Sequence, residues 1–118
     1  MNENAKKWVK ALRSGEFEQG QKHLRIGDNY CCLGVACELY RREVDGEWHP
    51  EQEWLAFITE GDSSSQVLPE PVREWLGLTH GDGFFDDENE SLANANDNGS
   101  TFDEIADTIE GEPRWLFE

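Results

Sequence analysis

Residues 30–42 read YCCLGVACELYRR, which is the least polar segment of the chain. On a helix its apolar side chains cover an arc of about 160°, so the segment predicts a helix that is buried on most of its surface. Glu38 precedes Arg41 and Arg42 by three and four residues, a spacing that favours ion pairs on the polar side. We expect this segment to be the central helix of the fold. Its apolar positions are Cys32, Leu33, Val35, Ala36, Leu39 and Tyr40.

The N-terminal segment predicts a second, amphipathic helix. Asn2 or Asn4 can cap its first turn, and Gly15 is a stop signal after an end near Ser14. At about 100° per residue, the apolar positions gather on one side and the basic positions on the other. The apolar positions are Ala5, Trp8, Val9 and Leu12, and the basic positions are Lys6, Lys10 and Arg13.

Two segments of the C-terminal half also carry helix signals. The prolines of residues 69–71 suit a first helical turn, and Gly77 suits the position after an end at Leu76. Thr101 and Glu104 have the spacing of a capping box, which predicts a last helix that ends near Glu110. We expect Phe102, Ile105, Ala106 and Ile109 to form the buried side of this helix and Asp103, Asp107 and Glu110 to form its outer side.

The middle of the chain is ambiguous. Residues 45–46 (Asp-Gly) suggest a turn before a short strand at 47–48. Pro50 and the glutamates after it resemble the start of a helix that runs to Gly61. A strand at residues 54–58 is the alternative. Residues 61–65 (GDSSS) are expected to form a loop.

Together these patterns predict one α+β domain over residues 1–118, which is an ordinary length for a single domain. The fold is expected to be mostly helical, with four to five short helices around the 30–42 segment. One small strand pair is expected near Leu24 and Trp48. The loop at 81–90 should be anchored to the core by the pair Phe84-Phe85.

The charge of the chain is strongly acidic and regional. It has 26 acidic and 10 basic residues, a formal net charge of −16, and no Lys or Arg between Glu74 and Glu112. A field of this sign repels nucleic acids and membrane surfaces and attracts basic protein surfaces. We therefore expect no direct nucleic-acid or membrane binding. The chain also lacks a run of about 18 apolar residues and a secretory signal, so a cytosolic location is expected.

No motif predicts catalysis, a cofactor or a metal. Cys31, Cys32 and Cys37 are odd in number, two are adjacent, and their spacing suits neither a disulfide nor zinc, so they are expected to be buried thiols. Residues 94–105 resemble a calcium loop, but Ile105 stands where the bidentate Glu is required. Residues 81–83 lack the further glycines and the lysine of a phosphate loop.

The sharpest functional hypothesis concerns the acidic C-terminal residues. Carboxylates one helical turn apart are separated by about 6 Å, which is close to the phosphate repeat of nucleic acid. A rigid helix with such a row could occupy a phosphate-binding groove of a basic protein. An ordinary solvated helix face is the alternative. The residues expected to bind the partner are Asp86, Asp87, Glu88, Glu90, Asp103, Asp107 and Glu110.

Four segments together resemble a family of small uncharacterised proteins encoded mainly by tailed bacteriophages and prophages. They are residues 8–15 (WVKALRSG), 30–37 (YCCLGVAC), 68–78 (LPEPVREWLGL) and 96–110 (NDNGSTFDEIADTIE). The resemblance implies a phage accessory protein that acts in the host cytoplasm. It supplies no catalytic residue.

The leading expectation is therefore a non-enzymatic protein that binds a basic host or defence protein. It would inhibit that partner by mimicking the charge of nucleic acid. The first alternative is a protein that binds or sequesters a small ligand such as a nucleotide. In that case aromatic side chains would stack on a base, and Lys or Arg from the first half would hold phosphate. The aromatic candidates are Tyr40, Trp48, Trp54 and Trp75. An enzyme of unknown class is the third alternative.

Overall fold

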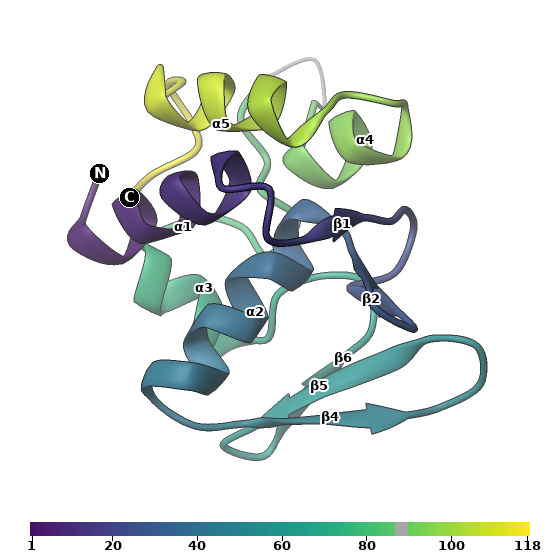
Figure 1. Ribbon diagram of the computed structural model, residues 1–118. Helices are drawn as coiled ribbons and strands as arrows, with labels where there is room; N and C mark the ends of the chain where they lie inside the picture. Colours follow the sequence, from purple (N-terminus) through teal and green to yellow (C-terminus); the bar gives the residue numbers. More distant parts are fainter. Residues whose placement is uncertain (87–89) are drawn as a thin grey trace.

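The computed structural model describes residues 1–86 and 90–118. Most of the apolar segment 30–42 forms its central helix, α2 (Cys32–Glu43). The helix begins after Cys31, whose extended backbone and Sγ atom, an acceptor for the Gly34 N–H at 3.4 Å, serve as the N-cap. Tyr30 lies outside the helix, in strand β3. Figure 1 shows α2 between the N-terminal helix above it and the strands of residues 47–64 below it.

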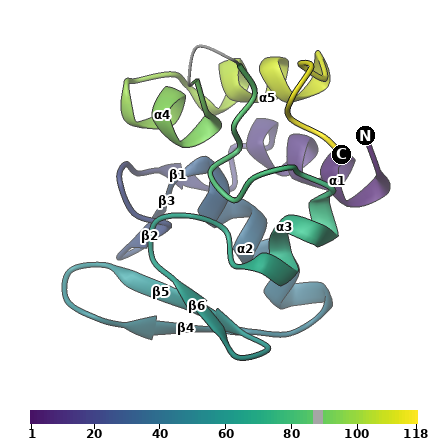
Figure 2. The ribbon, with the colours of Figure 1, turned by 180° about the vertical axis from the view of Figure 1, so that it is seen from behind.

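In the described residues, four more helices pack around α2 or on its neighbours (Figures 1 and 2). Helices α4 and α5 form an outer layer, and α5 lies along α1. Helix α3 lies behind α2 in the first view and is seen clearly in the second. The bounds are α1 (Glu3–Arg13), α3 (Glu70–Leu76), α4 (Leu92–Asp97) and α5 (Phe102–Glu110).

The signals read from the sequence for the ends of α1, α3 and α5 are confirmed. Asn2 caps α1 by accepting the Ala5 N–H at 2.8 Å. Gly77 ends α3 with a φ of 77°, a left-handed conformation that glycine adopts without steric cost. Thr101 and Glu104 form the reciprocal capping box of α5. Each of these ends depends on residues within a few positions of one another.

The strands form one mixed sheet, so the prediction of a single strand pair is wrong although the α+β class is confirmed. The order is β1-β3-β2-β5-β4, and β6 pairs with β5 as well. Among the strands of the described residues, only β1 and β3 pair in parallel. The strands are β1 (Glu18–Gln19), β2 (Arg25–Ile26), β3 (Asn29–Tyr30), β4 (Glu47–Pro50), β5 (Leu55–Thr59) and β6 (Asp62–Ser64).

The helix predicted from Pro50 to Gly61 is wrong, and the strand alternative is correct. Residues 55–59 pair with β4 on one side and with β6 on the other, and residues 61–65 contribute β6 instead of a loop. Pro50 ends β4, where a missing N–H costs little. The helix-start signal at Pro50 does not produce a helix, because strand pairing on both sides satisfies the backbone hydrogen bonds of β5 and buries Phe57 beneath α2.

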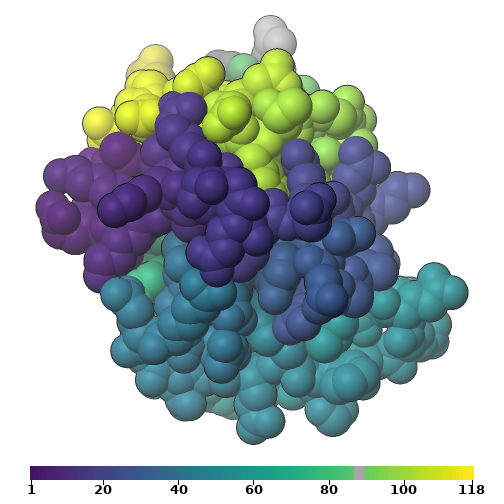
Figure 3. Space-filling view, in the orientation of Figure 1, coloured from purple at the N-terminus to yellow at the C-terminus, as the bar shows by residue number. Residues whose placement is uncertain are grey.

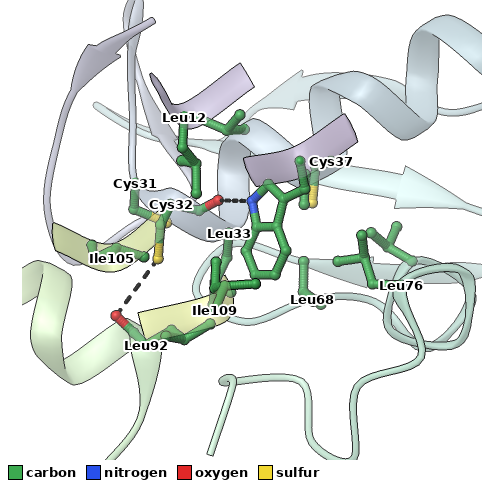
Figure 4. Packing of buried hydrophobic residues seen from close by; sticks show 14 of the residues in the cluster. Leu12, Cys31, Cys32, Leu33, Cys37, Leu68, Leu76, Leu92, Ile105 and Ile109 are labelled. Carbon is green, nitrogen blue, oxygen red and sulfur yellow. Dashed lines mark hydrogen bonds between the residues drawn. The ribbon is translucent and has the colours of Figure 1, made fainter. Parts of the chain in front are cut away.

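The core sits where α1, α2, α3 and α5 meet. Trp8 is fully buried, and its Nε1–H donates to the Cys32 carbonyl oxygen at 2.9 Å, a bond drawn as a dashed line in Figure 4. The Cys32 thiol lies 3.6 Å from the Leu92 carbonyl oxygen in the same view. Leu33, Leu76, Ile105 and Ile109, also labelled there, are fully buried or nearly so.

A buried amide joins three elements that are distant in sequence. Asn96 on α4 is fully buried, and its Oδ1 accepts from Gln19 Nε2 at 2.9 Å and from the Cys32 N–H at 3.1 Å. Its Nδ2 donates to the Gly20 carbonyl oxygen at 2.8 Å. Every partner would lose a bond inside the protein if this amide were removed.

Replacement of Asn96 by alanine is therefore expected to lower the free energy of unfolding by about 2 kcal/mol, because buried polar groups would be left unsatisfied. Urea denaturation followed by circular dichroism measures this change. Asn94, exposed on the same helix, gives the matched control, and its replacement by alanine should change stability by less than about 0.5 kcal/mol. Equal losses in the two variants would contradict the role of Asn96.

Candidate functional site

The acidic row predicted on the last helix exists, but it already holds a cation. Asp103, Asp107 and Glu110 lie on α5 with 74, 72 and 49% of their side chains exposed. Arg13 of α1 donates through Nη2 to Asp107 at 2.7 Å and also to Glu110, and it lies 3.9 Å from Asp103. The hydrogen bonds that Arg13 donates to Asp107 and Glu110 raise its pKa. The row is thus a fixed guanidinium-binding surface between two helices.

The other predicted partner-binding residues precede α4. Asp86 is half-buried and lines a cavity of about 290 Å³ with Phe85, Arg114 and Trp115. Glu90 is half-buried, and its carbonyl oxygen accepts the Phe85 N–H at 3.0 Å. Asp87 and Glu88 lie outside the described residues. Of the pair Phe84-Phe85 predicted to anchor this loop, Phe85 packs against the core, whereas Phe84 contacts the His80 ring with ring centres 5.1 Å apart.

Residues 90–112, which we call the acidic layer, contain seven carboxylates and no Lys or Arg. Arg13 and the α-amino group, the latter 2.7 Å from Glu112, offset two of these charges, and five remain. Figure 3 shows that this segment covers the top of the molecule in that view. Six of the seven residues are exposed, and Glu90 is half-buried. The seven are Glu90, Asp97, Asp103, Glu104, Asp107, Glu110 and Glu112.

The three cysteines are buried, as predicted. Burial raises the pKa of Cys31 to about 11 and raises the pKa values of Cys32 and Cys37 well above the ordinary value. Thiols with raised pKa values are poor nucleophiles. Within residues 1–86 and 90–118, no three His, Cys, Asp or Glu side chains are grouped as metal ligands.

A second arrangement of charge surrounds Glu38 of α2. The Glu38 side chain is only 6% exposed, and it accepts two bonds from Arg41 at 2.8 Å, one from Arg42 at 2.9 Å and one from Trp48 Nε1–H at 2.9 Å. Burial favours the neutral acid, but these hydrogen bonds outweigh it and lower the pKa of Glu38 to about 2. The ion pairs with both arginines were predicted from spacing, whereas the Trp48 bond was not.

An open cavity of about 410 Å³ lies beside this carboxylate. Strands β2 and β3, helix α2 and strand β4 meet there. The Arg25 guanidinium carbon lies 5.1 Å from the Tyr30 ring centre and 5.5 Å from that of Trp48, a cation–π geometry. The lining residues are Arg25, Tyr30, Glu38, Arg41, Gly46, Glu47 and Trp48.

Sequence reasoning named only one aromatic residue of this cavity. Among the four candidates for base stacking, Trp48 lines it. Tyr40 and Trp75 pack against each other with ring centres 5.4 Å apart, and Trp54 stacks on His23 at 4.3 Å. Arg25 and Tyr30 were not among the named candidates. A strand pair was expected near Leu24 and Trp48, but β5 lies between β2 and β4 in the sheet, and helix α2 separates these strands in sequence. A pairing of β2 with β5, if it had been foreseen, would have indicated their proximity.

In the part of the chain that the structure describes, every helix is too short or too polar to cross a bilayer.

The chain was compared with family models, curated proteins and solved structures. The model of a family described as a domain of unknown function (DUF8296) matches residues 1–113. No curated protein and no solved structure matches the chain significantly.

Proposed function

We propose that the chain, which belongs to the DUF8296 family, is a non-enzymatic protein that binds a basic protein through its acidic layer. The binding surface would be centred on Asp103, Asp107 and Glu110. The four-segment resemblance supports a phage accessory protein as its identity and a host or defence protein as its partner. Binding would then take place in the host cytoplasm.

The observation that carries this proposal is the contact of Arg13 with the α5 row. One guanidinium lies within 4 Å of all three carboxylates, yet each acidic side chain remains at least 49% exposed. The row therefore has the geometry to bind a guanidinium group, and its exposed carboxylates can bind another from a partner in addition to that of Arg13. Because α5 is capped at Thr101 and packed on α1, these carboxylates are held in place before a partner arrives.

The spacing of the row supports mimicry of nucleic-acid charge. Carboxylates about one helical turn apart repeat at roughly 6 Å, which suits Lys and Arg that are arranged for phosphates. The five uncompensated charges of the acidic layer would add long-range attraction toward such a groove. This mode predicts that duplex DNA competes with the protein for its partner.

The test removes charge and keeps Arg13 bonded. Reversal of the three charges would repel Arg13, so the variant of choice is Asp103→Asn/Asp107→Asn/Glu110→Gln, whose amide oxygens still accept hydrogen bonds. Immobilised wild-type protein should capture a basic nucleic-acid-binding protein from bacterial lysate, and excess duplex DNA should release it. The amide variant should capture at least about tenfold less of that protein. Each screened charge pair contributes modestly, but the variant removes three carboxylate charges at once.

The control variant carries the same change of net charge on the other side of the molecule. Glu47→Gln/Glu51→Gln/Glu53→Gln neutralises three exposed carboxylates around β4 and the loop after it. It should capture as much partner as wild type. Capture by the α5 amide variant at the wild-type level, or a captured protein that neither salt nor DNA releases, would refute the proposal.

A further inference from the structure

We infer that the cavity between β2, β3, α2 and β4 binds a nucleoside monophosphate, that is, a planar base joined to a phosphate group. Its volume of about 410 Å³ is in the range of sites for small molecules. It combines two guanidinium groups, Arg25 and Arg41, with two aromatic rings, Tyr30 and Trp48. This site is separate from the acidic layer, and the inference does not depend on the proposed function.

The guanidinium groups form the phosphate-binding part. Arg41 donates through Nε and Nη2 to Glu38, so its Nη1 is outside that pair. Arg25 donates through Nε to the Gly27 carbonyl oxygen at 2.7 Å and through Nη2 to Asp28 at 3.4 Å. The Asp28 side chain is 99% exposed, so a phosphate that displaced it would exchange a long, solvated contact for a closer one.

The aromatic rings form the base-binding part. The Trp48 N–H is satisfied by Glu38, so the half-buried indole presents carbon atoms to the cavity and no unpaired donor. Tyr30 lies 5.9 Å from Trp48 between ring centres, and the Arg25 guanidinium lies over both. Bases stack on aromatic rings, so the two rings suit a planar heterocycle.

The electrostatics favour this location over the rest of the surface. The lining contains two arginines and two glutamates and is formally neutral, whereas the whole chain carries −16. Glu38 is fully engaged by two arginines and Trp48, so its charge is compensated. Glu47 is exposed at the rim, where it can accept a hydrogen bond from a base amino group or a ribose hydroxyl.

The cavity is also preorganised. Three of the four hydrogen bonds to Glu38 hold Arg41 and Trp48 in place, and Trp48 further packs on Phe57 with ring centres 5.0 Å apart. Side chains that are already ordered lose little entropy when a ligand arrives.

The test is a titration of the wild-type protein with AMP and UMP, followed through the indole N–H resonance of Trp48 in ¹H–¹⁵N NMR spectra. We expect saturable shifts with a dissociation constant below about 1 mM. Inorganic phosphate alone and adenosine alone should each bind at least about tenfold more weakly than AMP, because each lacks one half of the contacts.

Two variants and a matched control locate the site. Arg25→Gln should weaken AMP binding at least about tenfold, and Arg25→Lys, which keeps the charge and loses the planar fork, should weaken it by about threefold. Arg114→Gln is the control, because Arg114 lies 4.9 Å from the Trp115 ring beside a different cavity. Its affinity for AMP should stay within about twofold of wild type.

Four outcomes would overturn the inference. The first is the absence of a saturable shift with either nucleotide up to about 10 mM. The second is phosphate binding as tight as AMP binding, which would mean that the rings recognise nothing. The third is adenosine binding as tight as AMP binding, which would remove the role of the arginines. The fourth is an equal loss of affinity in Arg25→Gln and Arg114→Gln.

Discussion

Replacement of Gly34 by alanine is expected to lower the free energy of unfolding by about 3 kcal/mol or more, or to prevent folding. A Cβ atom at this position would lie 1.8 Å from the Leu24 carbonyl oxygen and 2.7 Å from its carbonyl carbon. Leu24 cannot move aside easily. Its N–H donates to Ser65 at 2.7 Å, and its oxygen accepts from the Cys31 N–H at 3.2 Å. Urea denaturation followed by circular dichroism measures the loss.

Gly111 provides the control for this substitution. Its φ is −70°, and an added Cβ would meet its nearest atoms at 3.4 Å and 3.5 Å, which are ordinary contacts. Gly111→Ala should therefore change the free energy of unfolding by less than about 0.5 kcal/mol. A Gly34→Ala variant as stable as Gly111→Ala would show that α2 does not approach Leu24 as described.

The second large effect is expected from Glu38→Gln. The substitution removes the only carboxylate shared by Arg41, Arg42 and Trp48 in the described structure. It leaves Arg41 with a neutral partner, whereas Arg42 keeps its pair with Glu16 at 2.7 Å. Both arginine side chains are 43% exposed, so water compensates part of the loss. We expect a decrease of about 2 to 3 kcal/mol in the free energy of unfolding at pH 7.

Glu43→Gln on the same helix is the matched control. Glu43 also accepts from a cation, Lys7 at 2.7 Å, but both side chains are largely exposed. Surface pairs of this kind contribute little, so the loss should stay below about 1 kcal/mol. Equal losses at the two positions would contradict the importance of burial at Glu38.

Wild type and Glu38→Gln together also test the pKa of Glu38. In the folded protein this pKa is lowered from 4.5 to about 2, so the folded state favours the carboxylate. The stabilisation is complete above about pH 4.5 and is lost as the pH falls toward 2. The difference in unfolding free energy between wild type and Glu38→Gln should therefore shrink over this range. A constant difference would mean that the pKa is not lowered.

The sequence predicted local features well and pairings poorly. The ends of α1, α3 and α5 were confirmed because caps and left-handed glycines act within one turn of a helix. Residues 50–61 were predicted wrongly because a helix-start signal at Pro50 is also compatible with the end of a strand. Strand β5 exists because β4 and β6 pair with it, and no local sequence pattern predicts which segments will pair.

The candidate sites show the same contrast between local features, which the sequence predicts, and long-range contacts, which it does not. The acidic row of α5 was predicted from helical spacing, and its residues lie on the outer side of the helix as expected. That Arg13 lies within this row was not predictable, since 94 residues separate it from Asp107. The cavity at Trp48 was missed for the same reason. Its arginines and rings come from four elements that only the sheet and α2 bring together.

The sequence alone determined that most of YCCLGVACELYRR forms the central helix, that the cysteines are buried and that the C-terminal half is acidic. These properties depend on side-chain polarity, helical period and composition, which are present in the unfolded chain. Only the tertiary structure decided that Gly34 must be glycine, that Glu38 orients Trp48 and that Arg13 pairs with α5. Each of these depends on a contact between atoms distant in sequence, and chain topology, not local preference, sets such distances.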